Sequence, residues 1–148
     1  VTGRLLFGRL LAAADRGARV RLLLDDMGSA GIDPLIAAAS AQPNFEVRLF
    51  NPTARGPLPG LARFFDLMFH MRRLNHRMHN KLLAVDGAAG IVGGRNVGDE
   101  YFDAREGVNF ADLDLLAVGP VVGELGQSFD QYWNSPFAVP ASAWRSLR

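Results

Sequence analysis

Residues 79–96 read HNKLLAVDGAAGIVGGRN and have the pattern of two short strands joined by a turn. The apolar run Lys81–Val85 is the first predicted strand, and Gly90–Val92 is the second. Asp86-Gly87 lies between them, and Asp-Gly is a dipeptide that commonly marks a tight turn. The stretch therefore predicts a hairpin, around which the rest of the fold can be placed.

Helices and strands alternate upstream of this hairpin. Apolar spacing and capping residues predict a helix from Thr2 to about Asp15, a strand over Val20–Leu24, a helix from Asp33 to about Ala41, and a strand over Phe45–Phe50. Strands separated by helices favour parallel pairing, in which the loops at the carboxyl ends of the strands form the usual ligand site.

Downstream of the hairpin, the sequence predicts a strand over Asp114–Val118 and a final helix with Leu125 and Trp133 on its apolar side. The tail from about Ser135 has the character of a linker. We expect a single α/β domain over residues 1–148, with a mixed, mostly parallel sheet flanked by helices on both faces.

Composition excludes several classes of protein. The 148 residues are 49% hydrophobic and 21% charged, carry a net charge of +1 and include no cysteine. A chain of about 150 residues can close a single core. Without cysteine, disulfides and thiolate zinc sites are excluded. The apolar runs are shorter than the roughly 18 residues that a membrane-spanning helix needs, so any membrane contact is expected to be peripheral.

Charge is balanced overall but segregated along the chain. Five basic residues against one acid lie within 63–81, together with all three histidines, whereas eight acids against one arginine lie within 99–130. Two solvated faces are the simplest interpretation. An apolar helix is predicted over Phe64–Met71; it either packs in the core or contacts acyl chains at an interface.

The chemistry-bearing side chains gather around the hairpin. Side chains alternate faces along a strand, so His79 and Lys81 are expected on one side, about 7 Å apart. The second strand leads into Gly93-Gly94-Arg95-Asn96. Imidazole, ammonium, carboxamide and glycine amides are the groups that a phosphoryl centre needs, and such a set requires neither a metal ion nor a cofactor. Each residue taken alone also has an ordinary structural explanation.

The spacing His79-x-Lys81, four residues, Asp86, six residues, Gly93-Gly94-x-Asn96 resembles the HKD motif of the phospholipase D superfamily. The flanking stretches 48–52, 74–81, 92–102 and 114–120 are similar to bacterial cardiolipin synthases of the C type. The resemblance covers roughly residues 4–135. Many family members carry serine where this sequence has Gly94, so a hydroxyl near the expected phosphate is absent.

The resemblance implies roles for individual residues. His79 would attack the phosphodiester and form a phosphohistidine, while the histidine of a second HKD motif protonates the leaving alcohol. Lys81 and Asn96 would hold the phosphoryl oxygens, and Gly93 and Gly94 would line the substrate site. Asp86 would orient the site or its partner strand.

This sequence contains one HKD motif, whereas enzymes of the family carry two or dimerise. We therefore expect an amino-terminal half without the family's first strand, inactive until a second half joins it in cis or from a homodimer mate. The expected activity is phosphatidyl transfer that ends in cardiolipin.

The expected substrate is phosphatidylglycerol or phosphatidylethanolamine, reached peripherally at the cytoplasmic side of the bacterial inner membrane. The alternative is a homodimeric phosphodiesterase or nuclease, since nucleic acid would also use the basic segment. Nucleic acid is not the expected partner, and a purely scaffolding role is disfavoured because the motif is intact.

Overall fold

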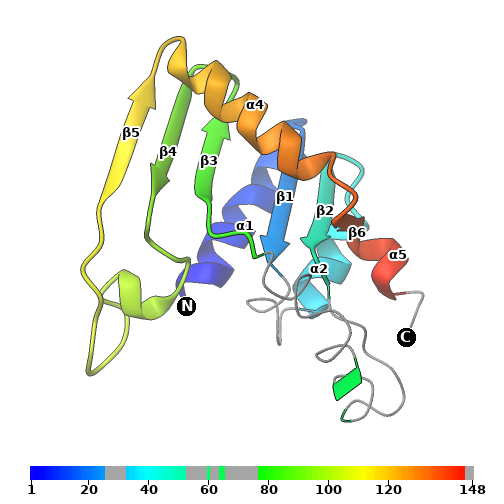
Figure 1. Ribbon diagram of the computed structural model, residues 1–148, viewed down its shortest axis with the longest axis horizontal. Coiled ribbons are helices and arrows are strands. Elements are labelled where there is room, and N and C mark those ends of the chain that lie inside the picture. The colour runs from blue at the N-terminus through cyan, green and yellow to red at the C-terminus, as the bar shows by residue number, and fades with distance from the viewer. Residues whose placement is uncertain (26–32, 53–59, 61–63, 66–76, 146–148) are drawn as a thin grey trace. The chain divides into compact units, whose positions relative to one another are not determined.

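The computed structural model describes residues 1–25, 33–52, 60, 64–65 and 77–145 (Figure 1). The chain forms two compact units, one made of residues 1–10 with 79–131 and the other of residues 11–78 with 132–148. The single domain over residues 1–148 that the sequence predicts stays a prediction. No helix in the described part of the chain is long and apolar enough to cross a membrane.

In the unit of residues 11–78 and 132–148, three strands form a sheet in the order β1-β2-β6. Strand β1 (Val20–Asp25) and strand β2 (Phe45–Phe50) are parallel, with α2 (Asp33–Ser40) between them in sequence. Asp25 lies opposite Phe50, so both strands end at the same edge of the sheet. The alternation predicted for β2 is confirmed, because its alternate residues Phe45, Val47 and Leu49 are buried.

Aromatic side chains hold the carboxyl end of the chain against β2. The ring of Phe50 packs on Tyr132 and Phe137, with ring centroids 5.6 and 6.0 Å apart. Trp133 is 3% exposed, and the Arg48 guanidinium lies 4.4 Å above its ring. Burying one such aromatic side chain stabilises the fold by about 1.5–3 kcal/mol.

The sequence predicts a linker from about Ser135, and the structure corrects this. Strand β6 (Ala138–Pro140) pairs antiparallel with β2, and α5 (Ala141–Arg145) follows it. Ala138 and Ala141 are both buried. Small side chains permit this close packing, which a count of apolar residues does not reveal.

In the unit of residues 1–10 and 79–131, strands β3 (Lys81–Val85), β4 (Ala89–Gly93) and β5 (Asp114–Val118) form an antiparallel sheet in that order (Figure 1). The 3-10 helix η2 (Asp99–Tyr101) lies between β4 and β5 in sequence, and α4 (Val121–Trp133) follows β5. Val122 of α4 is 1% exposed and packs with Leu125 at Gly90, where an added Cβ would lie 3.2 Å from Leu125. Helix α4 therefore covers the Gly90 face of this sheet.

Helix α1 (Thr2–Asp15) matches the predicted span, but its cap differs. The sequence predicts that Thr2 is the cap, whereas the helix already includes Thr2 and the Asp99 carboxylate accepts the Thr2 N–H at 2.6 Å. A carboxylate at a helix amino terminus is favourable because it satisfies free N–H groups and opposes the positive end of the dipole.

The α/β class and the mixed strand pairing are confirmed, but parallel pairing does not prevail. Among the four described strand pairs, β1–β2 is parallel and the other three are antiparallel. The β3–β4 turn explains one of these, because a tight turn can join only antiparallel strands. Phe64 and Phe65 are helical and about half exposed, whereas residues 66–71 of the predicted apolar helix lie outside the described part.

The β3–β4 turn depends on Gly87. Its φ is +63° and that of Asp86 is +53°, and the Ala88 N–H donates to the Val85 carbonyl at 2.9 Å, so two successive residues of this tight turn are left-handed. Gly87→Ala should lower the free energy of unfolding by about 1–2 kcal/mol, because L side chains are strained in the left-handed region.

Gly126 in the middle of α4 is the matched control for this substitution, since no atom lies within 4 Å of a Cβ added there. Gly126→Ala should raise the free energy of unfolding by up to about 1 kcal/mol through helix propensity. Denaturant unfolding of the chain measures both, and effects of the same sign would contradict the turn assignment.

Candidate active site

His79 and Lys81 lie at the start of β3. Lys81 is the first residue of the strand, and the exposed His79 precedes it in an irregular segment. The Lys81 ammonium Nζ donates a hydrogen bond to the backbone carbonyl of His79 at 2.7 Å. The cation is thus held within the motif, next to the residue that carries the imidazole.

The glycine pair reaches the same end of the hairpin from β4. Lys81 lies opposite Gly93, and Gly93 lies opposite Asp114 of β5. Asn96 follows within three residues, is exposed, and donates from Nδ2 to the Tyr101 hydroxyl at 3.0 Å. The structure therefore brings Lys81 and the glycine pair to one end of the hairpin, with His79 just before β3 and Asn96 just after β4.

Asp86 lies at the other end of the hairpin. Five residue steps along β3 separate Asp86 from Lys81, which at about 3.3 Å per residue is roughly 17 Å. Asp86 is exposed and occupies the first left-handed position of the turn. Of the predicted site residues, Asp86 is the one that the structure does not bring to the Lys81 end.

Two acidic side chains that the sequence analysis did not single out lie against the glycines. A Cβ on Gly93 would overlap the Asp114 carboxylate and lie 2.6 Å from the Leu113 carbonyl. A Cβ on Gly94 would lie 2.5 Å from Asp112 Oδ1. The Gly94 N–H donates to the Leu113 carbonyl at 3.4 Å, so this amide takes part in the contact with the start of β5.

Arg95, which lies between the glycine pair and Asn96, connects this loop to the 3-10 helix and to the start of β5. Its Nε forms an ion pair with Asp114 Oδ2 at 2.8 Å, and its Nη1 and Nη2 donate to the carbonyls of Tyr101 and Asp112 at 2.8 and 3.0 Å. The guanidinium also lies 5.3 Å from the Phe102 ring. The planar fork of arginine suits this role because it serves several acceptors at once.

The acidic segment 99–130 was the signal that could have revealed Asp112 and Asp114. Antiparallel pairing of Gly93 with Asp114 places this pair of acids beside the glycines. In the described part of the chain, no cluster of three or more histidine, aspartate or glutamate residues could hold a metal ion. The groups gathered here suit nucleophilic attack on phosphorus, with an imidazole, an ammonium and a carboxamide at one strand end.

Comparison with known proteins identifies the family. Residues 1–133 match the family described as "Cardiolipin synthase, PLD-like domain". Cardiolipin synthase C of Escherichia coli (strain K12) is 50% identical over 133 residues, which are 90% of this chain and 27% of that protein. An uncharacterized protein of Helicobacter pylori is 41% identical over 149 aligned positions, 99% of this chain and 29% of that protein.

A cardiolipin synthase of Staphylococcus aureus (strain Mu50) is 34% identical over 134 residues, 90% of this chain and 25% of that protein. The chain thus spans between 25% and 29% of the length of these relatives. The family match includes β3, β4 and β5 with every predicted site residue. The chain belongs to the family of phospholipase D-like domains found in cardiolipin synthases.

Proposed function

We propose that the protein containing this chain is a phosphatidyltransferase that makes cardiolipin, with His79 as its nucleophile. The observation that carries the proposal is the exposed His79 beside Lys81, whose ammonium bonds the His79 carbonyl at the end of the hairpin. The cardiolipin synthases of Escherichia coli and Staphylococcus aureus that resemble this chain support the same conclusion.

The reaction needs two histidines. A neutral His79 ring nitrogen attacks phosphorus, a P–N bond forms, and the P–O bond to the leaving alcohol breaks. In this first step the leaving oxygen takes a proton from a second, protonated histidine. In the next step the incoming alcohol attacks phosphorus and displaces His79, and the second histidine, now neutral, accepts the proton of that alcohol. One ring cannot be neutral and protonated in the same step, so a second half must contribute the acid, in cis or from a homodimer mate.

Lys81 and Asn96 have donors for the phosphoryl oxygens. An ammonium has three N–H donors, and the bond to the His79 carbonyl uses one of them. The Asn96 amide has two N–H donors, and one is bonded to Tyr101. Hydrogen bonds from a cation to an anionic oxygen are roughly twice as strong as neutral ones, so Lys81 would contribute the larger share of charge stabilisation.

Asp86 would act on the hairpin and not on the phosphate. It occupies the turn at the far end of β3, where a left-handed conformation suits aspartate, asparagine and glycine. Gly93 and Gly94 would allow the start of β5 to pack close to the β4 backbone. Asp114 and Asp112 occupy the space that a side chain at Gly93 or Gly94 would need.

The substrate would be a phospholipid such as phosphatidylglycerol or phosphatidylethanolamine, reached from the cytoplasmic side of the bacterial inner membrane. Phe64 and Phe65 expose 54% and 53% of their surface, and two adjacent exposed rings support a peripheral membrane contact. The names of the relatives favour this activity over the alternative of a homodimeric nuclease or phosphodiesterase.

Replacing His79 tests the nucleophile directly. In the complete protein, His79→Ala should lower cardiolipin formation from phosphatidylglycerol by more than about a thousandfold, because the covalent intermediate is deleted. Asn80→Ala, at the neighbouring exposed position, is the matched control and should keep near-normal turnover. Near-normal turnover of His79→Ala would exclude the proposed role.

Replacing Lys81 separates charge from geometry. Lys81→Arg keeps the charge but exchanges a compact ammonium for a planar fork, so most of the activity should be lost. Lys81→Met removes the charge and should lose nearly all of it. The same assay of cardiolipin formation measures both variants. If both turned over normally, Lys81 would be an ordinary surface charge.

The two glycines should differ in their tolerance of a side chain. Gly93→Ala places a Cβ 2.6 Å from the Leu113 carbonyl and 2.9 Å from the Asp114 Cα, which are backbone atoms that cannot rotate away. It should lower the free energy of unfolding by about 1–3 kcal/mol. Gly94→Ala meets only the Asp112 side chain, which can turn aside, so its cost in denaturant unfolding should be smaller. The reverse order would contradict this packing.

A further inference from the structure

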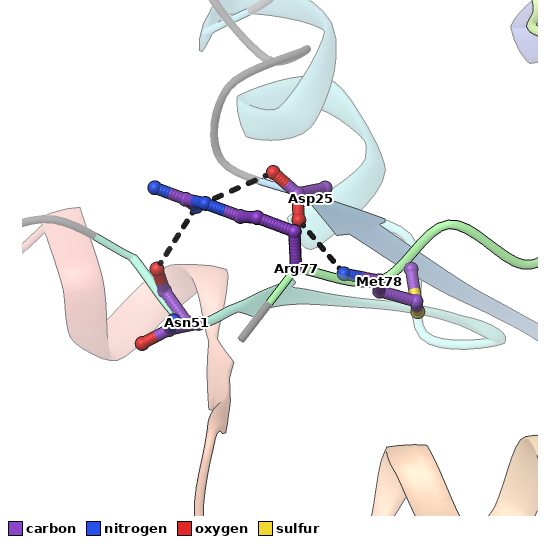
Figure 2. A network of polar contacts seen from close by, with 4 residues as sticks. All are labelled: Asp25, Asn51, Arg77 and Met78. Carbon is purple, nitrogen blue, oxygen red and sulfur yellow. Dashed lines mark hydrogen bonds and ion pairs between the residues drawn. The ribbon is translucent and has the colours of Figure 1, made fainter. Parts of the chain in front are cut away.

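Asp25, the last residue of β1, binds the two residues that precede His79 (Figure 2). One carboxylate oxygen, Oδ2, accepts the backbone N–H of Met78 at 3.2 Å. The other, Oδ1, pairs with Nη1 of Arg77 at 3.4 Å. Asp25 thus contacts both the side chain and the main chain of the segment that leads into the motif.

Arg77 also reaches the end of β2. Its Nη1 donates to the main-chain carbonyl of Asn51 at 3.5 Å (Figure 2). Asn51 is 2% exposed and has a φ of +48°, a left-handed conformation that asparagine tolerates. Its N–H donates to the Phe137 carbonyl at 2.8 Å, so the accepting carbonyl belongs to a residue held by the core.

These contacts lie at the edge where the parallel strands β1 and β2 both end. We name Asp25, Asn51, Arg77 and Met78 the Asp25 clamp. The Arg77 and Asp25 side chains are only 16% and 20% exposed. An ion pair that is mostly shielded from water is screened less by salt than a surface pair.

We propose that Asp25 is a positioning residue for His79, an inference that rests on the proposed function. His79 is joined to Met78 by a peptide bond, and the Asp25 clamp holds Met78 by its N–H. The hydrogen bond from the Met78 N–H to Asp25 limits rotation of the main chain just before His79. Asp25 itself touches no reacting atom. Arg77, although part of the basic segment, makes internal contacts with Asp25 and Asn51.

The test compares Asp25 variants in the complete protein. Asp25→Ala should lower kcat for cardiolipin formation by about a hundredfold with KM nearly unchanged, because a nucleophile misplaced by about 1 Å loses that much rate. Asp25→Asn should lose less, because its amide oxygen can still accept the Met78 N–H. Glu46→Gln, which breaks the Glu46–Arg48 ion pair on β2, is the control and should keep kcat.

A double variant distinguishes positioning from general loss of stability. Asp25→Ala and Arg77→Met both remove the Asp25–Arg77 ion pair, so their combined loss in kcat should be smaller than the product of the two single losses. Additive losses would mean that the two residues act independently, and they would overturn the proposal. An unchanged kcat in a folded Asp25→Ala variant would overturn it as well.

Hydrogen exchange provides a readout that does not depend on activity. In the complete protein, the Met78 amide should exchange slowly in the wild type and in Glu46→Gln, and at least about tenfold faster in Asp25→Ala, because a bonded N–H exchanges only when its bond opens. Equal exchange rates would overturn the clamp. If the wild type made no cardiolipin, the proposed function would fail, and Met78 exchange alone would decide the clamp.

Discussion

The pairing of Lys81 with Gly93 is the constraint on which this half-site depends. Side chains alternate along a strand, so a slip of one residue would turn Lys81 to the opposite face and separate it from the Gly93–Asp114 row. The three-residue turn 86–88, which joins Val85 to its partner Ala89, fixes that register. A turn at one end of the hairpin therefore determines which residues lie opposite one another at the other end, where Lys81 faces Gly93.

Close packing at the end of β4 places opposite charges beside one another. Because Gly93 and Gly94 lack side chains, the carboxylates of Asp114 and Asp112 approach the β4 backbone. Two carboxylates would repel a phosphate, but the Arg95 guanidinium pairs with Asp114 at 2.8 Å. The ammonium of Lys81 is bonded to the neutral carbonyl of His79, and the proposed function uses its charge on a phosphoryl oxygen.

The sequence predicts correctly those helices and strands whose hydrophobic pattern lies within the element itself. Periodicity gave α1 over Thr2–Asp15 and alternation gave β2 over Phe45–Phe50, because the core takes every second side chain of that strand. Strand β6 has only three residues, too few for a pattern, and it is held by pairing with β2. The contact of Asp114 with Gly93 was not predicted because it depends on the register of two strands joined by a long connection.

The sequence predicts a ligand site at the edge where β1 and β2 end, and the structure places two residues of the chain itself there. Parallel strands that end together usually form a site for substrate, since loops and free backbone groups collect there. In this chain the ends of β1 and β2 bind Arg77 and Met78, which belong to the same polypeptide. The Asp25 carboxylate and the Asn51 carbonyl at that edge bind the segment that precedes His79, whereas the groups suited to phosphorus chemistry lie at the β3–β4 hairpin. An edge that binds substrate in other α/β proteins therefore holds, in this chain, the main chain that leads into His79, which is the residue proposed as the nucleophile.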